Sequence, residues 1–148
     1  LLRVGDLVTV EGPYGRFDFA SASAAGKRRQ IWVGGGIGIT PFIARMKALA
    51  VASDGRAVDL FYSTAEPDQG FISRLQRDAQ AAGVKLHVLM SARDGRLDAA
   101  RICDTVPAWA DADVWFCGPG GFGQALREGF VARGLAAADF HQELFDMR

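Results

Sequence analysis

A run of glycines between an apolar segment and a helix-like pattern is the feature that most restricts how this chain can fold. Residues 30–50 read QIWVGGGIGITPFIARMKALA. A Thr-Pro pair follows the glycines, and proline is accepted in the first turn of a helix, where the N–H it lacks has no partner. The pattern predicts a strand at 30–35, a glycine loop, and a helix at 40–52 with Thr40 as its cap and Pro41 in its first turn.

The remainder of the chain repeats this alternation of strand and helix. We expect strands at 7–10, 57–63, 84–91, 112–118 and 139–145, and helices at 68–82, 97–106 and 120–133. Strands that alternate with helices favour a parallel sheet, because each crossover packs a helix on the sheet. From residue 30 onward the predicted fold class is therefore α/β: a doubly wound five-stranded parallel sheet with helices on both faces.

Composition excludes several classes of function. The 148 residues include 17 basic and 17 acidic side chains, so the net charge gives no reason to expect nucleic acid or an anionic membrane as a partner. Cys103 and Cys117 form no motif with each other or with histidine, so neither a disulfide framework nor a metal site is expected. No apolar run reaches membrane-spanning length and no signal peptide opens the sequence, which favours a reduced, cytoplasmic setting.

The glycine loop suits an anionic ligand. Glycines let a ligand approach the backbone closely, and the free N–H groups and dipole at a helix start favour negative charge, so a dinucleotide pyrophosphate is the expected ligand. The loop does not match G-x-G-x-x-G, no acid ends the second strand at Tyr62-Ser63-Thr64, and no Gly-Lys-Ser/Thr occurs. A turn that serves only tight strand–helix packing is the alternative.

A second candidate site follows the strand at 112–118. Cys117, Gly118 and Pro119 stand at its end, and Phe122 opens the next helix. In a doubly wound sheet this loop should lie beside the glycine loop, at the ligand crevice. The alternative for the thiol is a small buried apolar group.

The C-terminal segment offers a third site. If 139–145 is the fifth strand, Glu143 and Phe145 come near the same carboxyl edge of the sheet. Taken alone, core packing for the phenylalanine and a solvated terminus for the glutamate are the more ordinary interpretations. His141 is expected to be structural.

Together these motifs resemble the ferredoxin–NADP reductase superfamily. They are GGGIGITPF, CGPGGF and FHQELF, in that order, and EGPYGRF resembles the closing segment of the family's flavin-binding barrel. The chain looks most like bacterial ferric-reductase and NADPH-oxidase-like members, with the oxygenase reductases close behind. The resemblance implies an NAD(P)H-binding domain at 30–148, preceded at 1–29 by a C-terminal remnant of a flavin-binding β-barrel plus a linker.

The resemblance also implies roles for the matched residues. The residues that would hold the pyrophosphate and its ribose are Gly34, Gly35, Gly36, Ile37, Gly38, Thr40 and Pro41. Cys117, Gly118 and Pro119 would border the nicotinamide, and Phe122 is a further cofactor-binding candidate. The catalytic candidates are three: Cys117 would pack near the carbon that gives up hydride, Phe145 would cover the flavin until the nicotinamide displaces it, and Glu143 would lie beside that junction.

Residues after the second and third strands bear on the choice of nucleotide. A 2′-phosphate needs cationic or hydroxyl partners. Ser63 and Thr64 follow the second strand, and Ser91 and Arg93 the third, where NADPH-selecting relatives carry an adjacent Ser-Arg pair; here Ala92 separates the two. NADPH is favoured over NADH on this basis, with an ordinary surface arginine as the alternative for Arg93.

The implied function is hydride transfer from NAD(P)H to FAD, with electrons passed on to a one-electron acceptor such as ferric ion or haem. FAD would be held mainly by an upstream barrel in the same polypeptide, since the family's Arg-x-Tyr-Ser/Thr motif does not occur here, and this chain alone should be inactive. A haem-containing transmembrane domain is a further expected partner, which would place the domain at the cytoplasmic face of the inner membrane. A non-catalytic NAD(P)H-sensing module and a flavodoxin-like FMN domain are the alternatives.

Overall fold

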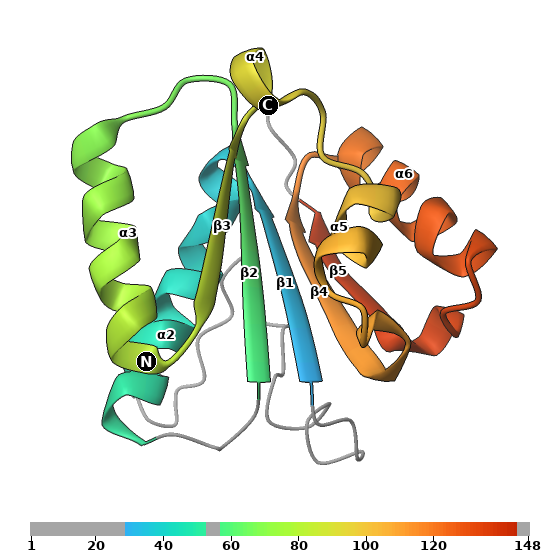
Figure 1. The fold of residues 1–148 in the computed structure, drawn as a ribbon, viewed down its shortest axis with the longest axis horizontal. Helices are drawn as coiled ribbons and strands as arrows, with labels where there is room; N and C mark the ends of the chain where they lie inside the picture. Colours follow the sequence, from blue (N-terminus) through green and yellow to red (C-terminus); the bar gives the residue numbers. More distant parts are fainter. Residues whose placement is uncertain (1–28, 53–56, 145–148) are drawn as a thin grey trace, which may run out of the picture.

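A parallel sheet of five strands organises the chain (Figure 1). The computed structural model describes residues 29–52 and 57–144, with side chains described as far as residue 142. The strands are β1 (Arg29–Gly35), β2 (Ala57–Thr64), β3 (Lys85–Met90), β4 (Ala112–Gly118) and β5 (Phe140–Leu144), and their order in the sheet is β3-β2-β1-β4-β5. All four pairings are parallel, which confirms the predicted fold class.

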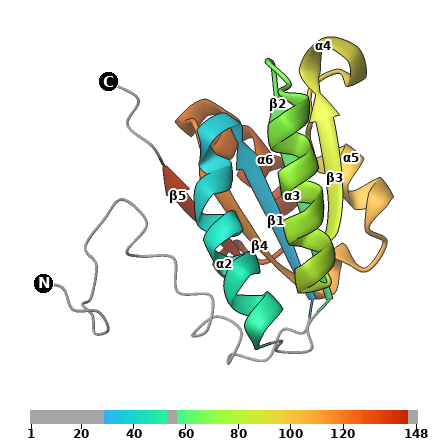
Figure 2. The same ribbon diagram turned by 90° about the vertical axis from the view of Figure 1, so that its left-hand side faces the viewer.

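Helices cover both faces of this sheet. They are α2 (Thr40–Val51), α3 (Gln69–Ala82), α4 (Ser91–Asp94), α5 (Ala99–Thr105) and α6 (Gly120–Ala132), with 3₁₀ turns η1 (Gly36–Ile39), η2 (Trp109–Asp111) and η3 (Ala137–Asp139). Figures 1 and 2 show α2 and α3 on one face of the sheet and α5 and α6 on the other. The expected strand at 7–10 and almost all of the proposed barrel remnant lie outside the described residues.

The central strand β1 serves two hydrophobic cores. Its side chains alternate between faces, so Ile31 and Val33 pack in the cluster under α5 and α6 while Trp32 packs in the cluster under α2 and α3. All three are fully buried. A strand buried on both faces reads as a continuous apolar run, which is why the stretch before the glycines could be recognised from sequence.

Two local features differ from the sequence-based expectation. Thr40 does not cap α2: Ile39 occupies the cap position without a side-chain bond, and the Thr40 hydroxyl donates to the Ile37 carbonyl at 3.1 Å. Pro41 does lie in the first turn, as predicted. The one-turn helix α4 was not predicted; the Met90 N–H donates to the Asp94 carboxylate at 3.0 Å, which closes the turn and removes Ser91 from the strand.

Each edge strand is tied to its inner neighbour by an aspartate–histidine pair near the amino ends of the strands. On β2 and β3, the Asp59 carboxylate lies 2.9 Å from His87 Nε2 and also accepts from Arg29 at 3.1 Å. On β4 and β5, the Asp113 carboxylate lies 3.2 Å from His141 Nε2. Both carboxylates are buried, whereas the histidines are partly exposed.

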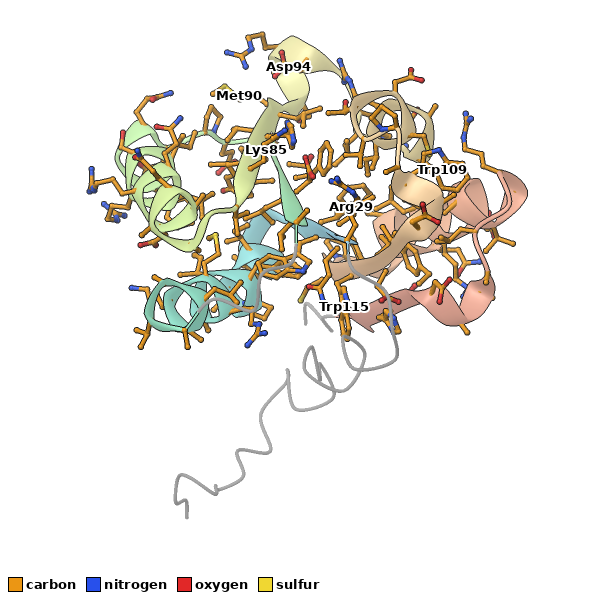
Figure 3. All side chains as sticks on the ribbon, turned by 60° about the horizontal axis from the view of Figure 1, so that its bottom comes forward. Arg29, Lys85, Met90, Asp94, Trp109 and Trp115 are labelled. Carbon is orange, nitrogen blue, oxygen red and sulfur yellow. The ribbon has the colours of Figure 1, made fainter. Side chains whose placement is uncertain are left out.

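The two pairs are built in the same way on opposite faces of the sheet. Each histidine stands opposite an aromatic residue in the strand register and stacks on it, with ring centroids 4.5 Å apart for Phe61–His87 and 4.2 Å apart for Trp115–His141. Figure 3 shows Met90 and Asp94 at the top of the view, with Arg29 and Trp115 below them. The pairs therefore hold the sheet together at the end away from the glycine loop, and His141 is structural, as expected.

Replacing the more heavily used carboxylate should weaken the sheet. Asp59→Asn keeps the shape of the side chain but removes the charge that receives both Arg29 and His87. Lost charge-assisted hydrogen bonds of this kind are worth about 1–3 kcal/mol. We expect urea unfolding to show that loss with an unchanged m-value, whereas Asp104→Asn, an exposed position on α5, should change stability by less than about 0.5 kcal/mol. Equal stability of the two variants would contradict this.

Candidate functional site

The glycine loop and the end of β4 meet at the carboxyl edge of the sheet. Gly34 pairs in register with Cys117, and Cys117 pairs with Glu143 on β5. The three predicted motifs are thus brought side by side across three neighbouring strands. This is the arrangement expected for a crevice outside the carboxyl ends of parallel strands.

A first cavity of about 330 Å³ opens at this edge. It is lined by Gly35, Gly36, Ile37, Ser63, Thr64, Ala65, Ser91, Pro119 and Phe122. These residues come from the ends of β1, β2 and β3 and from the start of α6. Ala65 is the one lining residue that the sequence had not indicated, so the structure gathers most of the predicted nucleotide contacts around one space.

A second cavity of about 540 Å³ adjoins the first, because Ser63, Ser91 and Phe122 line both. Its further lining residues are Arg96, Leu97, Asp98, Gly121, Ala125 and Leu126. None of these was singled out from sequence. We call the two cavities together the crevice; it lies at the end of the sheet where α4 stands in Figure 1.

The glycines of the loop are needed for different reasons: some for packing within the protein, others for open space at the crevice. A Cβ on Gly38 would lie 2.0 Å from the carbonyl oxygen of Cys117, and one on Gly34 would lie 3.0 Å from the Cα of Ile39. These two glycines are therefore required by packing within the protein. A side chain on Gly38 would therefore collide with β4 and not with a ligand, while a contact between its backbone and a pyrophosphate stays a prediction.

Gly35 and Gly36 face the crevice itself. A Cβ on Gly35 would stand 2.9 Å from the Phe122 ring. Gly36 has φ +56°, a left-handed conformation that glycine adopts readily, and a Cβ there would meet nothing within 4 Å. Beside it, Ile37 is 60% exposed at the mouth of the first cavity. This short stretch is where backbone is open to an incoming group.

Cys117 is fully buried in the core under α2 and α3, and it lines neither cavity. Gly118, the next residue, backs onto Gly35: a Cβ there would lie 3.3 Å from the Gly35 backbone. The other cysteine, Cys103, lies on α5 and packs into the core cluster on that face of the sheet, and burial raises the pKa of its thiol. Neither cysteine forms a disulfide in the described part of the chain.

Arg93 lies outside the crevice. Its guanidinium donates two hydrogen bonds of 2.9 Å to the neighbouring Asp94 carboxylate. Those bonds, with the one from the Met90 N–H, lower the pKa of Asp94 to about 2. The arginine predicted to meet a 2′-phosphate is thus engaged by a carboxylate one residue away.

The remaining catalytic candidates are placed only in part. The backbone of β5 puts Glu143 opposite Cys117, while its side chain and the whole of Phe145 fall outside the described portion. The described residues contain no cluster of three histidine, cysteine or acidic side chains able to hold a metal ion. They also include no helix long and apolar enough to cross a bilayer.

Comparison with known proteins finds similarity to oxidoreductases and reductase subunits. No protein-family model matches the chain. It is 33% identical over 123 residues to the vanillate O-demethylase oxidoreductase of Pseudomonas putida, covering 82% of this chain and 37% of the relative. It is 32% identical over 148 aligned positions to the carnitine monooxygenase reductase subunit of Escherichia coli K12, covering 97% of this chain and 42% of the relative.

Among solved structures, the fold matches a flavohemoglobin from Malassezia yamatoensis with bound FAD and heme. The TM-score is 0.74 at 26% identity, over 90% of this chain and 36% of the flavohemoglobin. The chain belongs to the ferredoxin–NADP reductase superfamily. It spans about two fifths of the length of the curated relatives it matches. The nearer resemblance to ferric reductases within that superfamily stays a prediction.

The packing role of Gly38 can be separated from ligand binding. Gly38→Ala should lower stability by about 1–3 kcal/mol or more, because its methyl group would collide with the Cys117 carbonyl and overpacking has a cost of this size. Gly121→Ala is the control, since a Cβ there meets nothing within 4 Å on α6. Thermal unfolding without any ligand measures both. Equal melting temperatures would show that the loop and β4 are not in the contact described.

Proposed function

We propose that this chain is the NAD(P)H-binding domain of a flavin-dependent electron-transfer reductase, an NAD(P)H:acceptor oxidoreductase. The observation that carries the proposal is the crevice, where the open backbone of Gly36 faces Pro119 and Phe122 at the carboxyl edge of a doubly wound sheet. Ligands of such sheets bind at this edge. The names of the relatives, an oxidoreductase, a reductase subunit and a flavohemoglobin, favour the same chemistry.

The residues of the crevice fit a dinucleotide. Small-molecule sites are largely apolar with a few placed polar groups. Here Ile37, Pro119 and Phe122 supply apolar surface. The hydroxyls of Ser63 and Ser91 are shared by both cavities. Two adjoining spaces suit a ligand with two nucleoside halves joined by a pyrophosphate.

Each part of the chain then has a defined task. The backbone at Gly36 lets the pyrophosphate approach, and Gly118 and Pro119 border the nicotinamide. Cys117 supports this border from the core, with Glu143 and Phe145 as the residues beside the flavin. Bound NAD(P)H supplies a hydride, which flavin accepts and passes on as single electrons. The residues of this chain bind and orient the donor; no covalent step on the protein is involved.

The rest of the proposed protein lies beyond this chain. An FAD-binding barrel in the same polypeptide, upstream of residue 30, would hold most of the flavin. The acceptor would be a one-electron centre, with ferric ion and haem proposed from the resemblance to ferric reductases. A haem-containing transmembrane domain would place this domain at the cytoplasmic face of the inner membrane; without one, the reductase would be a cytoplasmic protein.

The proposal is tested on the complete protein under anaerobic conditions. Addition of NADPH or NADH should bleach the flavin absorption. Gly36→Asp and Gly36→Asn form a matched pair, since both residues tolerate the left-handed conformation and differ only in charge. The aspartate should weaken nucleotide binding by roughly 10-fold more than the asparagine, because a carboxylate at the pyrophosphate repels it and Coulomb energies near a surface reach this size.

Three results would contradict this proposal. Equal affinity of the Asp and Asn variants would mean that no phosphate approaches Gly36. A flavin that stays oxidised while NAD(P)H binds would instead favour the non-catalytic sensing module. Uptake of FMN by this chain in place of NAD(P)H would favour the flavodoxin-like alternative.

The two buried cysteines allow a matched test of the role proposed for Cys117. Cys117→Ala should slow flavin reduction by NAD(P)H while leaving nucleotide affinity nearly unchanged, because misplacing the donor ring affects the transfer step more than binding. Cys103→Ala, on α5, creates a similar small void in the core cluster on the other face of the sheet. Stopped-flow reduction of both variants measures the difference. Identical rates would leave Cys117 with a packing role alone.

A further inference from the structure

Among the described residues, Arg96 is the only cation in the lining of the crevice. It stands between α4 and α5, and its side chain makes no hydrogen bond or ion pair with any other described residue. Its neighbours differ in this respect. Arg93 is bound to the Asp94 carboxylate, and Arg101 donates to the Asp94 carbonyl oxygen. Of these three arginines, Arg96 alone is available to an incoming anion.

The backbone on both sides of Arg96 is fixed. Gly95 ends α4 with φ +81°, a left-handed conformation that redirects the chain. Leu97, the residue after Arg96, is 2% exposed and packs in the core under α5 and α6. Asp98 then caps α5 by accepting the Arg101 N–H at 2.9 Å. The position of Arg96 at the second cavity is therefore set by the turn and not by chance exposure.

We propose that Arg96 selects NADPH over NADH by binding the 2′-phosphate of the adenosine ribose. This inference rests on the proposed function. A dinucleotide whose pyrophosphate lies at Gly36 extends its adenosine half into the second cavity, past Ser63 and Ser91, which line both spaces. The planar guanidinium presents paired donors that match a phosphate, and the two hydroxyls add further donors.

Asp98 is the residue that would favour NADH instead. Its carboxylate also lines the second cavity, and a carboxylate there would accept hydrogen bonds from the free ribose hydroxyls of NADH. In this structure one of its oxygens already serves as the cap of α5. The cation is free and the carboxylate is engaged, which favours recognition of a phosphate over recognition of a diol.

The test compares 2′,5′-ADP with 5′-AMP, which differ by one phosphate and need no flavin. Titration of the complete protein should show 2′,5′-ADP binding roughly 10- to 100-fold more tightly, the worth of a charged hydrogen bond. Arg96→Gln should abolish most of that ratio, and Arg96→Lys should restore part of it. Arg93→Gln and Arg127→Gln remove the same charge outside the crevice and should keep the ratio. Unchanged melting temperatures show that the variants fold.

The other outcomes are distinct. Loss of the ratio in Arg93→Gln but not in Arg96→Gln would assign the phosphate to the residue before Asp94 and overturn the inference. Equal binding of the two nucleotides, or tighter binding of 5′-AMP that Asp98→Asn abolishes, would overturn it in favour of NADH while leaving the proposed function intact. If neither nucleotide nor NAD(P)H binds, the proposed function itself fails.

Discussion

The close approach of the glycine loop to the end of β4 is the constraint on which the rest of the site depends. Gly38 lies so near the Cys117 carbonyl that a single methyl group cannot enter between them. This contact holds η1 against β4, beside the start of α6. Gly35 then faces the Phe122 ring, and Pro119 comes to the rim of the first cavity. The crevice exists because the glycine loop and the end of β4, which are far apart in sequence, are in direct backbone contact.

A glycine-rich loop is therefore not one signal but several. Gly34 and Gly38 satisfy packing, Gly35 leaves room for an aromatic ring, and Gly36 supplies a left-handed turn with open space beside it. The sequence suggested either phosphate binding or tight packing as the reason for the glycines. Both apply, to different residues. Only the three-dimensional structure shows which reason applies to which glycine, because the neighbouring residues come from β4 and α6, some eighty residues further along the chain.

What could be predicted follows from periodicity. Continuous apolar runs marked the buried strands, and the alternation with helices gave a parallel sheet whose element limits are met to within two residues. What escaped prediction was local. The turn α4 depends on one bond from Met90 to Asp94, and Arg93 is engaged by the residue beside it. Arg96 reaches the crevice through the conformation of Gly95. Sequence spacing alone does not reveal which of two nearby arginines is already paired.

The two ends of the sheet have separate tasks. At the amino ends, buried aspartates accept hydrogen bonds or lie against histidines and tie both edge strands inward. At the carboxyl ends, the described residues that line the crevice are mostly small or apolar, and their polar side chains are hydroxyls, the Asp98 carboxylate and one unpaired cation. Polar pairs that stabilise the sheet thus stay well away from the ligand edge. Because Arg96 takes part in neither aspartate–histidine pair, its substitution should change the proposed choice of nucleotide without weakening these contacts of the sheet.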